Sequence, residues 1–525
     1  MLSDMSRVVE DSARGGFYLT LGNITSTIIQ GISVFIIARI LGSEQYGLYT
    51  ISTVIPALFL LFVNPGIDQG ITKYSASLRT KGKKDRIAKL LAHGLLFKTT
   101  LATAALAICL IFADQFSIYM NRPGITDYLQ LASIVIIFQA IYTTIGAAFV
   151  GVDRTEYSAL TATIQAVVKA VAAPALVIIG LSIAGALMGS VLSFLVASLL
   201  GICFLIVKVY RPLNHSNLST EPFSNNLRML IRYGLPLYAS ALIYGFTQQY
   251  QYILLSIFTT DYEIGNFKAA TNFGILVSSL TIPIATVLLP AFSKLESKNQ
   301  DIREFLGMAI KYTSMAIIPL ATILILDAPG IVQIMYGEGY DWELAPAFLS
   351  TYAIQFLMVG LGSIVLGSLF SGLGETKINL KIALVHAVTI IILAPIFTSF
   401  LRIYGMITAI IVALIISTSY ALYTARSKYK IGLNIGTTAK IYIAAIISAV
   451  PILALQKILP TPTLLQVMLG TAIYLTTYLI LIPTTKIITQ PELNQIKTVI
   501  DKIQPLKYLA HPIFYFAEKI LSKMP

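Results

Sequence analysis

The feature that most constrains this chain is a series of continuous apolar runs that follow one another from about residue 17 to residue 486. A run of roughly 18 or more apolar residues is long enough to cross the hydrocarbon core of a bilayer. The strands of a membrane barrel would instead alternate apolar and polar residues over about ten positions. The sequence therefore predicts an all-α integral membrane protein.

The composition agrees with this interpretation. Hydrophobic residues make up 56% of the 525 residues, charged residues only 12%, and the mean hydropathy is +0.79. A soluble chain would carry roughly 25% charged residues. We expect about fourteen transmembrane helices, at approximately 17–40, 47–70, 90–113, 126–150, 157–180, 183–207, 234–258, 265–290, 304–326, 347–370, 377–400, 403–424, 439–459 and 464–486.

Basic residues gather on one side of these spans. One set of loops holds about twenty of them, including the cluster in residues 71–89 and the residues Lys208, Arg211, Arg228 and Arg232. The other set holds Arg122, Arg402 and Lys457, with Arg39 and Lys268 near helix ends. Positively charged loops stay in the cytoplasm, so with an even number of spans we expect both termini there.

The net charge of +13 fits the same picture. Anionic lipid of the inner leaflet is the partner that such cytoplasmic charge favours, so no nucleic acid is expected. Residues 488–525 are amphipathic, with Leu493, Ile496, Ile500 and Ile503 on one helical face. This pattern predicts a tail lying on the inner membrane surface, with a solvated tail as the alternative.

An internal repeat organises the spans. A shift of 218 residues pairs Gly16 with Gly234, Gln30 with Gln248, Gly47 with Gly265 and Pro65 with Pro283. A shift of 221 residues pairs Phe149 with Phe370, Gly151 with Gly372, Thr155 with Thr376 and Pro174 with Pro395. We predict two six-helix lobes at 1–210 and 211–430, related by an axis along the membrane normal, followed by two added helices in 431–487 and the tail.

The repeat places prolines at matching positions inside the spans. Pro65, beside Asn64, corresponds to Pro283, and Pro174 corresponds to Pro395. A proline removes one intrahelical hydrogen bond, and paired interruptions mark a binding site or hinge in transporters with repeats. We predict hinges at these four prolines, with an ordinary packing kink as the alternative.

Polar side chains within the spans are the candidate substrate ligands. Lys169 lies near the middle of its span, and Gln165 lies one turn before it on the same face. Gln165 corresponds to His386 in the repeat, and Lys98 is placed either in a cavity or reaching towards the inner headgroups. The predicted substrate-binding residues are Lys169, Gln165, His386, Gln30, Gln248, Gln251, Asn64 and Lys98.

The sequence lacks the motifs of nucleotide-binding and metal-binding proteins. No phosphate-binding loop of the Gly-Lys-Ser/Thr type is present, and Cys and His are too few and scattered for a metal site, so we expect no cofactor. Carboxylates are almost absent from the spans. Asp68 lies near the inner end of its helix, so coupling to protons or sodium through a buried acid is poorly supported.

Three segments resemble the polysaccharide-biosynthesis, or oligosaccharide flippase, branch of the MOP superfamily, which also includes MATE exporters and lipid II flippases. They are ARILGSEQYGLY at 38–49, IMYGEGY at 334–340 and GLGET at 372–376. The resemblance covers the first twelve spans, and the two added helices are similar to those of the fourteen-span flippases.

The resemblance implies a plasma-membrane flippase that is not an enzyme and acts as a monomer. It would move a sugar on a polyprenyl or dolichyl phosphate or diphosphate to the outer leaflet by alternating access, with Lys169 holding the phosphate. A lipid II substrate is less favoured, because the chain lacks a dense cluster of cavity arginines.

Two alternatives remain open. A MATE-like, cation-coupled exporter would have twelve spans and a carboxylate within the membrane. A membrane glycosyltransferase or polymerase would need a sizeable outer loop with acidic and basic catalytic residues. The longest outer loop, 327–346, has four acids and no His, Lys or Arg.

Overall fold

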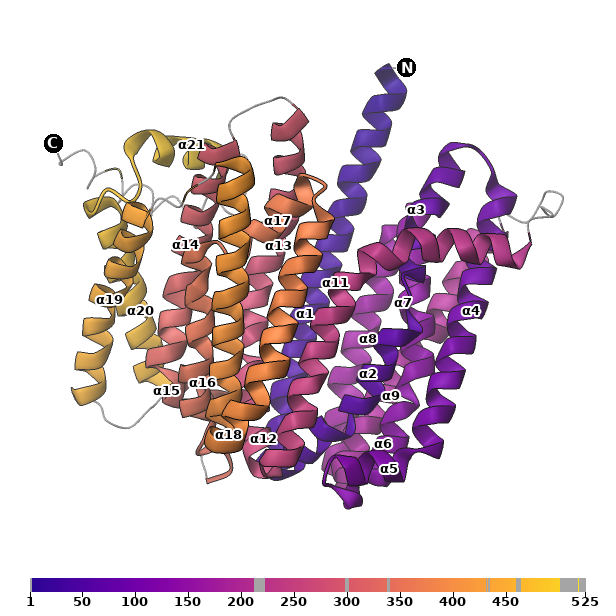
Figure 1. Ribbon diagram of the computed structural model, residues 1–525, viewed down its shortest axis with the longest axis horizontal. Helices are drawn as coiled ribbons and strands as arrows, with labels where there is room; N and C mark the ends of the chain where they lie inside the picture. The colour runs from indigo at the N-terminus through magenta and orange to yellow at the C-terminus, as the bar shows by residue number, and fades with distance from the viewer. Residues whose placement is uncertain are drawn as a thin grey trace. The chain divides into compact units, whose positions relative to one another are not determined.

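The structure is a computed structural model, and it describes residues 2–211, 222–297, 302–337, 340–430, 432, 435–458, 464–500 and 518. These residues are almost entirely helical and contain no strand, which confirms the predicted all-α class. Helices satisfy every backbone polar group within one segment, as a bilayer core requires. The α-helices in Figure 1 are α1 (Leu2–Ser52), α2 (Val54–Val63), α3 (Ile67–Thr80), α4 (Lys84–Ile111), α5 (Ala113–Tyr119), α6 (Thr126–Ser133), α7 (Val135–Gly151), α8 (Thr155–Leu176), α9 (Ser182–Leu205), α11 (Phe223–Phe258), α12 (Asp261–Asn272), α13 (Gly274–Ser297), α14 (Ile302–Leu326), α15 (Ala328–Tyr336), α16 (Ala345–Ala353), α17 (Val365–Gly372), α18 (Thr376–Tyr429), α19 (Ile435–Ile458), α20 (Leu464–Thr484) and α21 (Gln490–Ile500).

Within this described part of the chain, nine helical stretches are long and apolar enough to span a membrane, or ten if the bent pair Ala345–Leu361 and Val365–Gly372 is one span. Three of these stretches contain residues that leave the helical conformation, at Gly42, at Gly180 with Ser182, and at Arg402. Each such point ends one span and begins the next. The total is therefore compatible with the predicted fourteen spans.

The chain forms two compact units, each described here by itself. Unit 1 comprises residues 1–275, 339–344 and 379–413, and unit 2 comprises residues 276–338, 345–378 and 414–525. Helices α13 and α18 contribute to both units. These units reflect spatial contacts, whereas the lobes at 1–210 and 211–430 were inferred from sequence repetition. The lobes remain a prediction.

Small residues set the helix spacing in unit 1. A Cβ atom added at Gly22 of α1 would lie 2.4 Å from the Cβ of Ala159 in α8. A Cβ added at Gly189 of α9 would lie 2.3 Å from the Cα of Ala173 in α8. Close backbone approach at Gly and Ala favours association of membrane helices through van der Waals contact. Small residues therefore pack α1 and α9 closely against α8.

An even closer approach joins α1 to α12. A Cβ at Gly47 would lie 1.9 Å from the carbonyl oxygen of Asp261, and a Cβ at Gly265 would lie 1.8 Å from that of Ser43. Gly47 and Gly265 are equivalent in the sequence repeat. Nearby, Tyr46 is 2% exposed and its hydroxyl accepts a hydrogen bond from Asn272 at 2.9 Å.

Unit 2 surrounds α14 with α19 and α20. The amide of Gln456 in α19 donates to the backbone oxygen of Leu326 at 3.0 Å and to Asp327 at 3.3 Å. The hydroxyl of Tyr478 in α20 donates to the backbone oxygen of Met315 at 3.3 Å. These polar contacts attach the two helices beyond the predicted repeat to α14.

Helix α21 covers the first part of the predicted amphipathic tail. Glu492 of α21 accepts from Lys311 of α14 at 2.7 and 2.8 Å, and Leu493 is 3% exposed. This part of the tail is thus attached to the helices of unit 2. Residues 501–517 and 519–525 lie outside the described residues, and so do the side chains of Ile496, Ile500 and Ile503.

The α1–α12 contact gives a prediction for Gly47→Ala. The added methyl group has no space against the carbonyl of Asp261, so the two helices must separate. We expect a loss of about 1–3 kcal/mol in stability, seen as a lower midpoint of thermal denaturation in detergent. Gly124→Ala is the matched control, because its Cβ would meet nothing within 4 Å. Equal midpoints for the two variants would contradict the close packing.

Candidate functional site

The break between α2 and α3 carries the most buried ionic group of unit 1. Asn64, Pro65 and Gly66 separate the two helices, and Gly66 has a positive φ of 83°. The side chain of Asn64 accepts a hydrogen bond from the backbone N–H of Asp68 at 3.3 Å. Only glycine adopts this φ readily, and a Cβ there would also lie 2.0 Å from the carbonyl carbon of Gly234.

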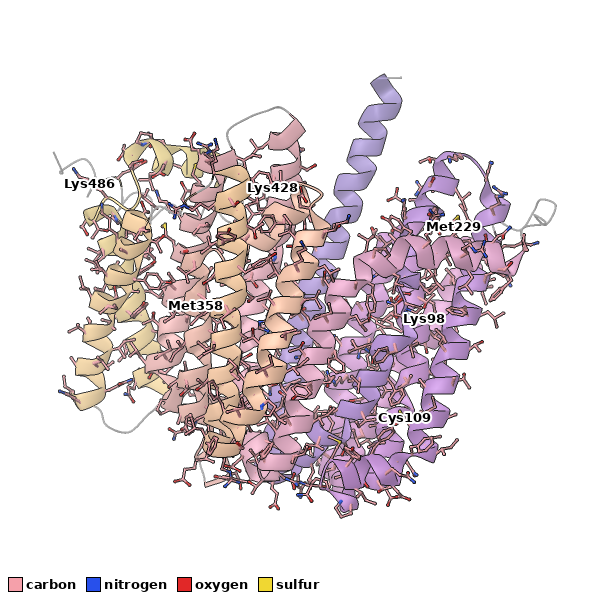
Figure 2. All side chains as sticks on the ribbon, viewed as in Figure 1. Lys98, Cys109, Met229, Met358, Lys428 and Lys486 are labelled. Atoms are coloured by element: carbon pink, nitrogen blue, oxygen red, sulfur yellow. The ribbon has the colours of Figure 1, made fainter. Side chains whose placement is uncertain are left out.

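Asp68 forms an ion pair with Lys98 just beyond this break. The Lys98 Nζ lies 2.5 Å from Asp68 Oδ2 and donates to the hydroxyl of Thr143 at 2.7 Å. The lysine side chain is 2% exposed and that of the aspartate 16%. Figure 2 labels Lys98 within the helices of unit 1. Lys98 therefore does not reach towards the headgroups, which was one of its two sequence-based placements.

The other oxygen of Asp68 is also buried, and within the described part of the chain neither it nor Gln69 Oε1 has a hydrogen-bond partner. A buried acceptor without a donor costs about 1–3 kcal/mol, so such groups mark positions with a role other than packing. The α2–α3 break thus combines a paired charge with two acceptors that are free to receive hydrogen bonds.

The spacing of Asp68 and Lys98 in the sequence indicates that they can pair, although the position of each residue within its own predicted span did not show it. Asp68 and Lys98 lie equally far, 15 residues, on either side of Lys83, where the α3–α4 hairpin turns. Residues equidistant from the turn of an antiparallel pair lie at the same depth. The position of Asp68 near the end of a single predicted span concealed this match.

Two predicted ligands are brought together elsewhere in unit 1. Gln30 of α1 donates through Nε2 to Oε1 of Gln165 in α8 at 3.2 Å. Gln165 in turn donates to the hydroxyl of Ser193 in α9 at 3.0 Å, and Gln165 is 3% exposed. The chain of amides joins three helices, which is the interhelical hydrogen bonding that membrane proteins commonly use.

Lys169 lies one turn beyond Gln165 in α8 and is half-buried. Among the described residues it has no hydrogen-bond or ion-pair partner, in contrast to Lys98. An ammonium group in a membrane helix is costly unless water or a counter-anion reaches it. Lys169 is therefore the predicted ligand whose charge stays available for an anion.

The remaining predicted ligands are more dispersed. Gln248 of α11 is exposed and Gln251 is half-buried. His386 of α18 is half-buried, with its ring 5.6 Å from that of Tyr244 in α11. The structure does not bring these three residues to Gln165 by any described hydrogen bond. Their role in substrate binding stays a prediction.

The predicted hinge prolines differ in their local structure. Pro65 lies in the break between α2 and α3, where the helix is interrupted. The helices continue through Pro174 in α8, Pro283 in α13 and Pro395 in α18. A single missing hydrogen bond is tolerated in a packed helix, whereas Pro65 acts together with Gly66. The hinge role of all four remains a prediction.

A second polar group lies at the opposite end of unit 1, in the loops predicted to face outwards. We call Arg122, Asp261, Glu263 and Arg402 the hairpin cluster. Arg122 contacts Asp261 at 2.7 Å and donates to the backbone oxygen of Thr259 at 2.6 Å, while Arg402 contacts Glu263 at 2.5 Å.

Glu263 is also held by the start of α12. Its backbone N–H donates to the Thr260 hydroxyl, and its carboxylate accepts from the backbone N–H of Thr260. This capping box fixes the carboxylate that Arg402 contacts. Arg122, Asp261 and Arg402 of the hairpin cluster line a cavity of about 580 Å³. Its ion pairs join residues 139 positions apart, so no local pattern in the sequence predicted them.

Comparison with known proteins identifies the family. The family model described as polysaccharide biosynthesis protein matches residues 12–296. The chain belongs to the polysaccharide biosynthesis protein family. Stage V sporulation protein B of Bacillus subtilis (strain 168) is 23% identical over 402 residues, covering 70% of this chain and 77% of that protein. A putative O-antigen transporter of Shigella dysenteriae is 22% identical over 354 residues, covering 67% of this chain and 85% of that protein.

Solved structures of the MOP superfamily share the fold of this family member. The lipid II flippase MurJ in an inward closed conformation matches with a TM-score of 0.70 and 17% identity, covering 89% of this chain and 99% of the flippase. An inward-facing MATE family transporter matches with a TM-score of 0.66 and 16% identity, covering 77% of this chain and 94% of the transporter. The family indicated by the sequence motifs is thereby confirmed. The chain is a multi-pass membrane protein that shares the fold of these transporters.

The Asp68–Lys98 pair yields a stability prediction. Asp68→Asn leaves the Lys98 ammonium without a counter-charge, and removal of one partner of a buried pair costs about 3–5 kcal/mol. We expect a marked fall in the thermal denaturation midpoint in detergent. The double variant Asp68→Asn/Lys98→Met removes both charges and should recover most of this loss. An Asp68→Asn protein as stable as the wild type would show that the pair contributes little.

Proposed function

We propose that this protein is a flippase for a lipid-linked oligosaccharide. Its substrate would be a sugar on a polyprenyl or dolichyl phosphate or diphosphate, moved from the cytoplasmic to the outer leaflet of the plasma membrane. The main support is membership of the polysaccharide biosynthesis protein family together with the fold shared with a lipid II flippase. The relatives are named as transporters or flippases, which favours transport over catalysis.

Lys169 is the proposed ligand of the phosphate. It is half-buried and, in the described part of the chain, lacks the counter-anion that Lys98 has in Asp68. A phosphate oxygen would supply that counter-charge through a charge-assisted hydrogen bond. The amides of Gln248 and Gln251 offer both donors and acceptors, which is the chemistry that sugar hydroxyls require.

The proposed mechanism is alternating access by two six-helix lobes. With both termini in the cytoplasm, the hairpin cluster lies on the outer side of the membrane. There the ion pairs Arg122–Asp261 and Arg402–Glu263 hold three helical hairpins together, beside the Gly47–Gly265 contact. These contacts must separate before a glycolipid can leave on that side. Monomeric action is part of the proposal, and anionic lipids of the inner leaflet are the proposed neighbours of the basic loops.

A MATE-like, cation-coupled exporter is the second candidate. The observation in its favour is the unpartnered Oδ1 atom of Asp68 within the membrane-spanning part of unit 1. The argument against it is that Lys98 already neutralises this carboxylate at 2.5 Å. An exported cation would therefore have to displace the lysine.

The flippase proposal predicts a specific effect of Lys169→Ala. In proteoliposomes with a fluorescent short-chain polyprenyl-phosphate sugar, the wild type should expose inner-leaflet dye to an impermeant quencher. Loss of one charge-assisted hydrogen bond, about 1.5–3 kcal/mol, should slow flipping about tenfold or more. Lys169→Arg keeps the charge and should retain most of the activity. Lys457→Ala, an exposed lysine of α19, is the control for removal of a charge.

Two results would count against this account. Wild-type protein that flips no glycolipid, with or without ion gradients, would favour the small-molecule exporter. Flipping at the wild-type rate by Lys169→Ala would leave the function in place and exclude Lys169 as the phosphate ligand.

A further inference from the structure

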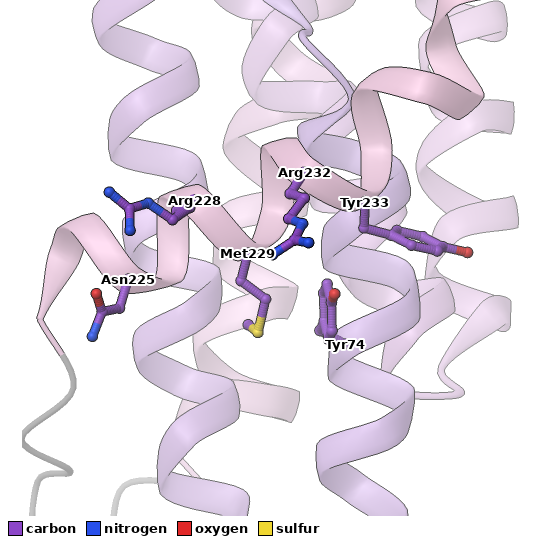
Figure 3. Close-up of a pocket in the computed structure, with 6 residues that line it drawn as sticks. All are labelled: Tyr74, Asn225, Arg228, Met229, Arg232 and Tyr233. Atoms are coloured by element: carbon purple, nitrogen blue, oxygen red, sulfur yellow. The ribbon is translucent and has the colours of Figure 1, made fainter.

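A pocket lies beside the first turns of α11, within unit 1. Its volume is about 560 Å³, and we call it the α11 pocket. Figure 3 shows its lining residues, which come from α11 and α3. They are Tyr74, Asn225, Arg228, Met229, Arg232 and Tyr233. None of them carries a carboxylate.

The segment of α11 that lines most of this pocket was predicted as a loop. The predicted span began at Gly234, whereas α11 begins at Phe223. Figure 1 shows these first turns running across α3 and α4. Only some residues of these turns are buried, at a helical spacing, as in an amphipathic surface helix. A hydropathy pattern scores such a helix as polar, which is why the predicted span began later than α11 does.

Contacts on its inner face fix this segment in place. Leu230 is fully buried, and it is the neighbour that a Cβ atom at Gly70 of α3 would meet at 2.8 Å. The amide of Asn226 lies 3.0 Å from Nδ1 of His93 in α4, and the His93 ring lies 5.1 Å from that of Phe223. Because the inner face of α11 is held by α3 and α4, the side chains on its outer face keep a fixed position.

That face concentrates positive charge without a counter-anion. Arg228 and Arg232 are four residues apart, so they lie on the same side of the helix, and both are exposed. Neither has a hydrogen-bond or ion-pair partner within the described residues. Lys73 adds a third cation, with its Nζ 3.6 Å from the centroid of the Tyr233 ring. Figure 3 shows the guanidinium of Arg232 turned towards Met229 and Tyr74, with that of Arg228 extending on the other side.

The residue types match a diphosphate carried on a hydrocarbon chain. Guanidinium groups bind phosphate oxygens in a bidentate manner, and two of them match two phosphates. The Tyr74 hydroxyl and the Asn225 amide are further donors. Met229 and the tyrosine rings provide apolar surface for the first carbons of a lipid tail. Basic pockets at the cytoplasmic ends of membrane helices bind lipid headgroups in this way.

We propose that the α11 pocket binds the diphosphate group of a polyprenyl lipid at the cytoplasmic membrane surface, before the lipid reaches Lys169. This inference rests on the proposed function for the identity of the lipid and on the charge distribution for the side of the membrane. It assigns Arg228 and Arg232 to capture of the headgroup, a step separate from translocation.

The test measures how fast a cysteine placed in the α11 pocket reacts, with and without a ligand. In a Cys109→Ala/Cys203→Ala background, Met229→Cys is labelled with a negatively charged methanethiosulfonate reagent in nanodiscs of neutral lipid. Farnesyl diphosphate, a short polyprenyl diphosphate, should slow labelling of Met229→Cys about tenfold at saturation. Ala76→Cys, exposed on α3 outside the pocket, should be labelled at an unchanged rate.

Arginine variants and a second ligand complete the experiment. Arg228→Gln/Arg232→Gln should shift the protecting concentration of farnesyl diphosphate upward by about tenfold or more. Arg426→Gln/Lys430→Gln, which removes two exposed charges at the end of α18, should leave it unchanged. Inorganic pyrophosphate should protect much more weakly, because it lacks the prenyl chain.

The outcomes distinguish failure of the pocket assignment from failure of the flippase proposal. No protection of Met229→Cys, or equal protection in the arginine double variant, would overturn the pocket assignment even if the protein flips glycolipid. Equal protection by pyrophosphate would overturn its assignment to a lipid. Protection that depends on the arginines, in a protein that flips nothing, would support the pocket and contradict the flippase proposal.

Discussion

Backbone contact between Gly47 of α1 and Gly265 of α12 sets the spacing of the helices around which unit 1 is built. Any side chain at either position would overlap the carbonyl oxygen of Asp261 or Ser43. Because the bilayer supplies no hydrophobic force between helices, such close van der Waals contact has to hold them together. The same approach positions Asp261 and Glu263, at the start of α12, for contact with Arg122 and Arg402.

Some polar groups within the helices have partners in the described structure, and others do not. Lys98 is neutralised by Asp68 and also donates a hydrogen bond to Thr143, and Gln165 forms hydrogen bonds with Gln30 and Ser193. These groups specify how their helices pack. Lys169 and the paired arginines of α11 lack such partners in the described structure, and an unpaired cation favours binding of an anion. The proposed path of a phosphate runs between these two places, from Arg228 and Arg232 at the surface to Lys169.

The sequence predicted the all-α membrane fold, the family and the interruption at Pro65, because each depends on local composition or a local motif. It could not predict the partner of Arg122, since pairing between segments 139 residues apart follows from tertiary packing. The pair Asp68–Lys98 was missed although both residues lie 15 positions from Lys83 in one hairpin. The early start of α11 was missed because polar and charged residues, among them Asn225, Arg228 and Arg232, lower the hydropathy of its first turns. Lys169 was selected for its depth, and the structure adds that its charge is not neutralised by a described neighbour. Its binding role awaits experiment.

The most direct test of alternating access is to lock the hairpin cluster. Arg122→Cys/Asp261→Cys, in a protein without Cys109 and Cys203, would be bridged by a short, reducible bis-methanethiosulfonate reagent and assayed for glycolipid flipping in proteoliposomes. The account predicts that flipping stops when the bridge forms, returns on reduction, and is unaffected by the reagent in either single-cysteine variant. Flipping at the full rate by protein shown by mass spectrometry to be bridged would contradict the opening of this end during transport.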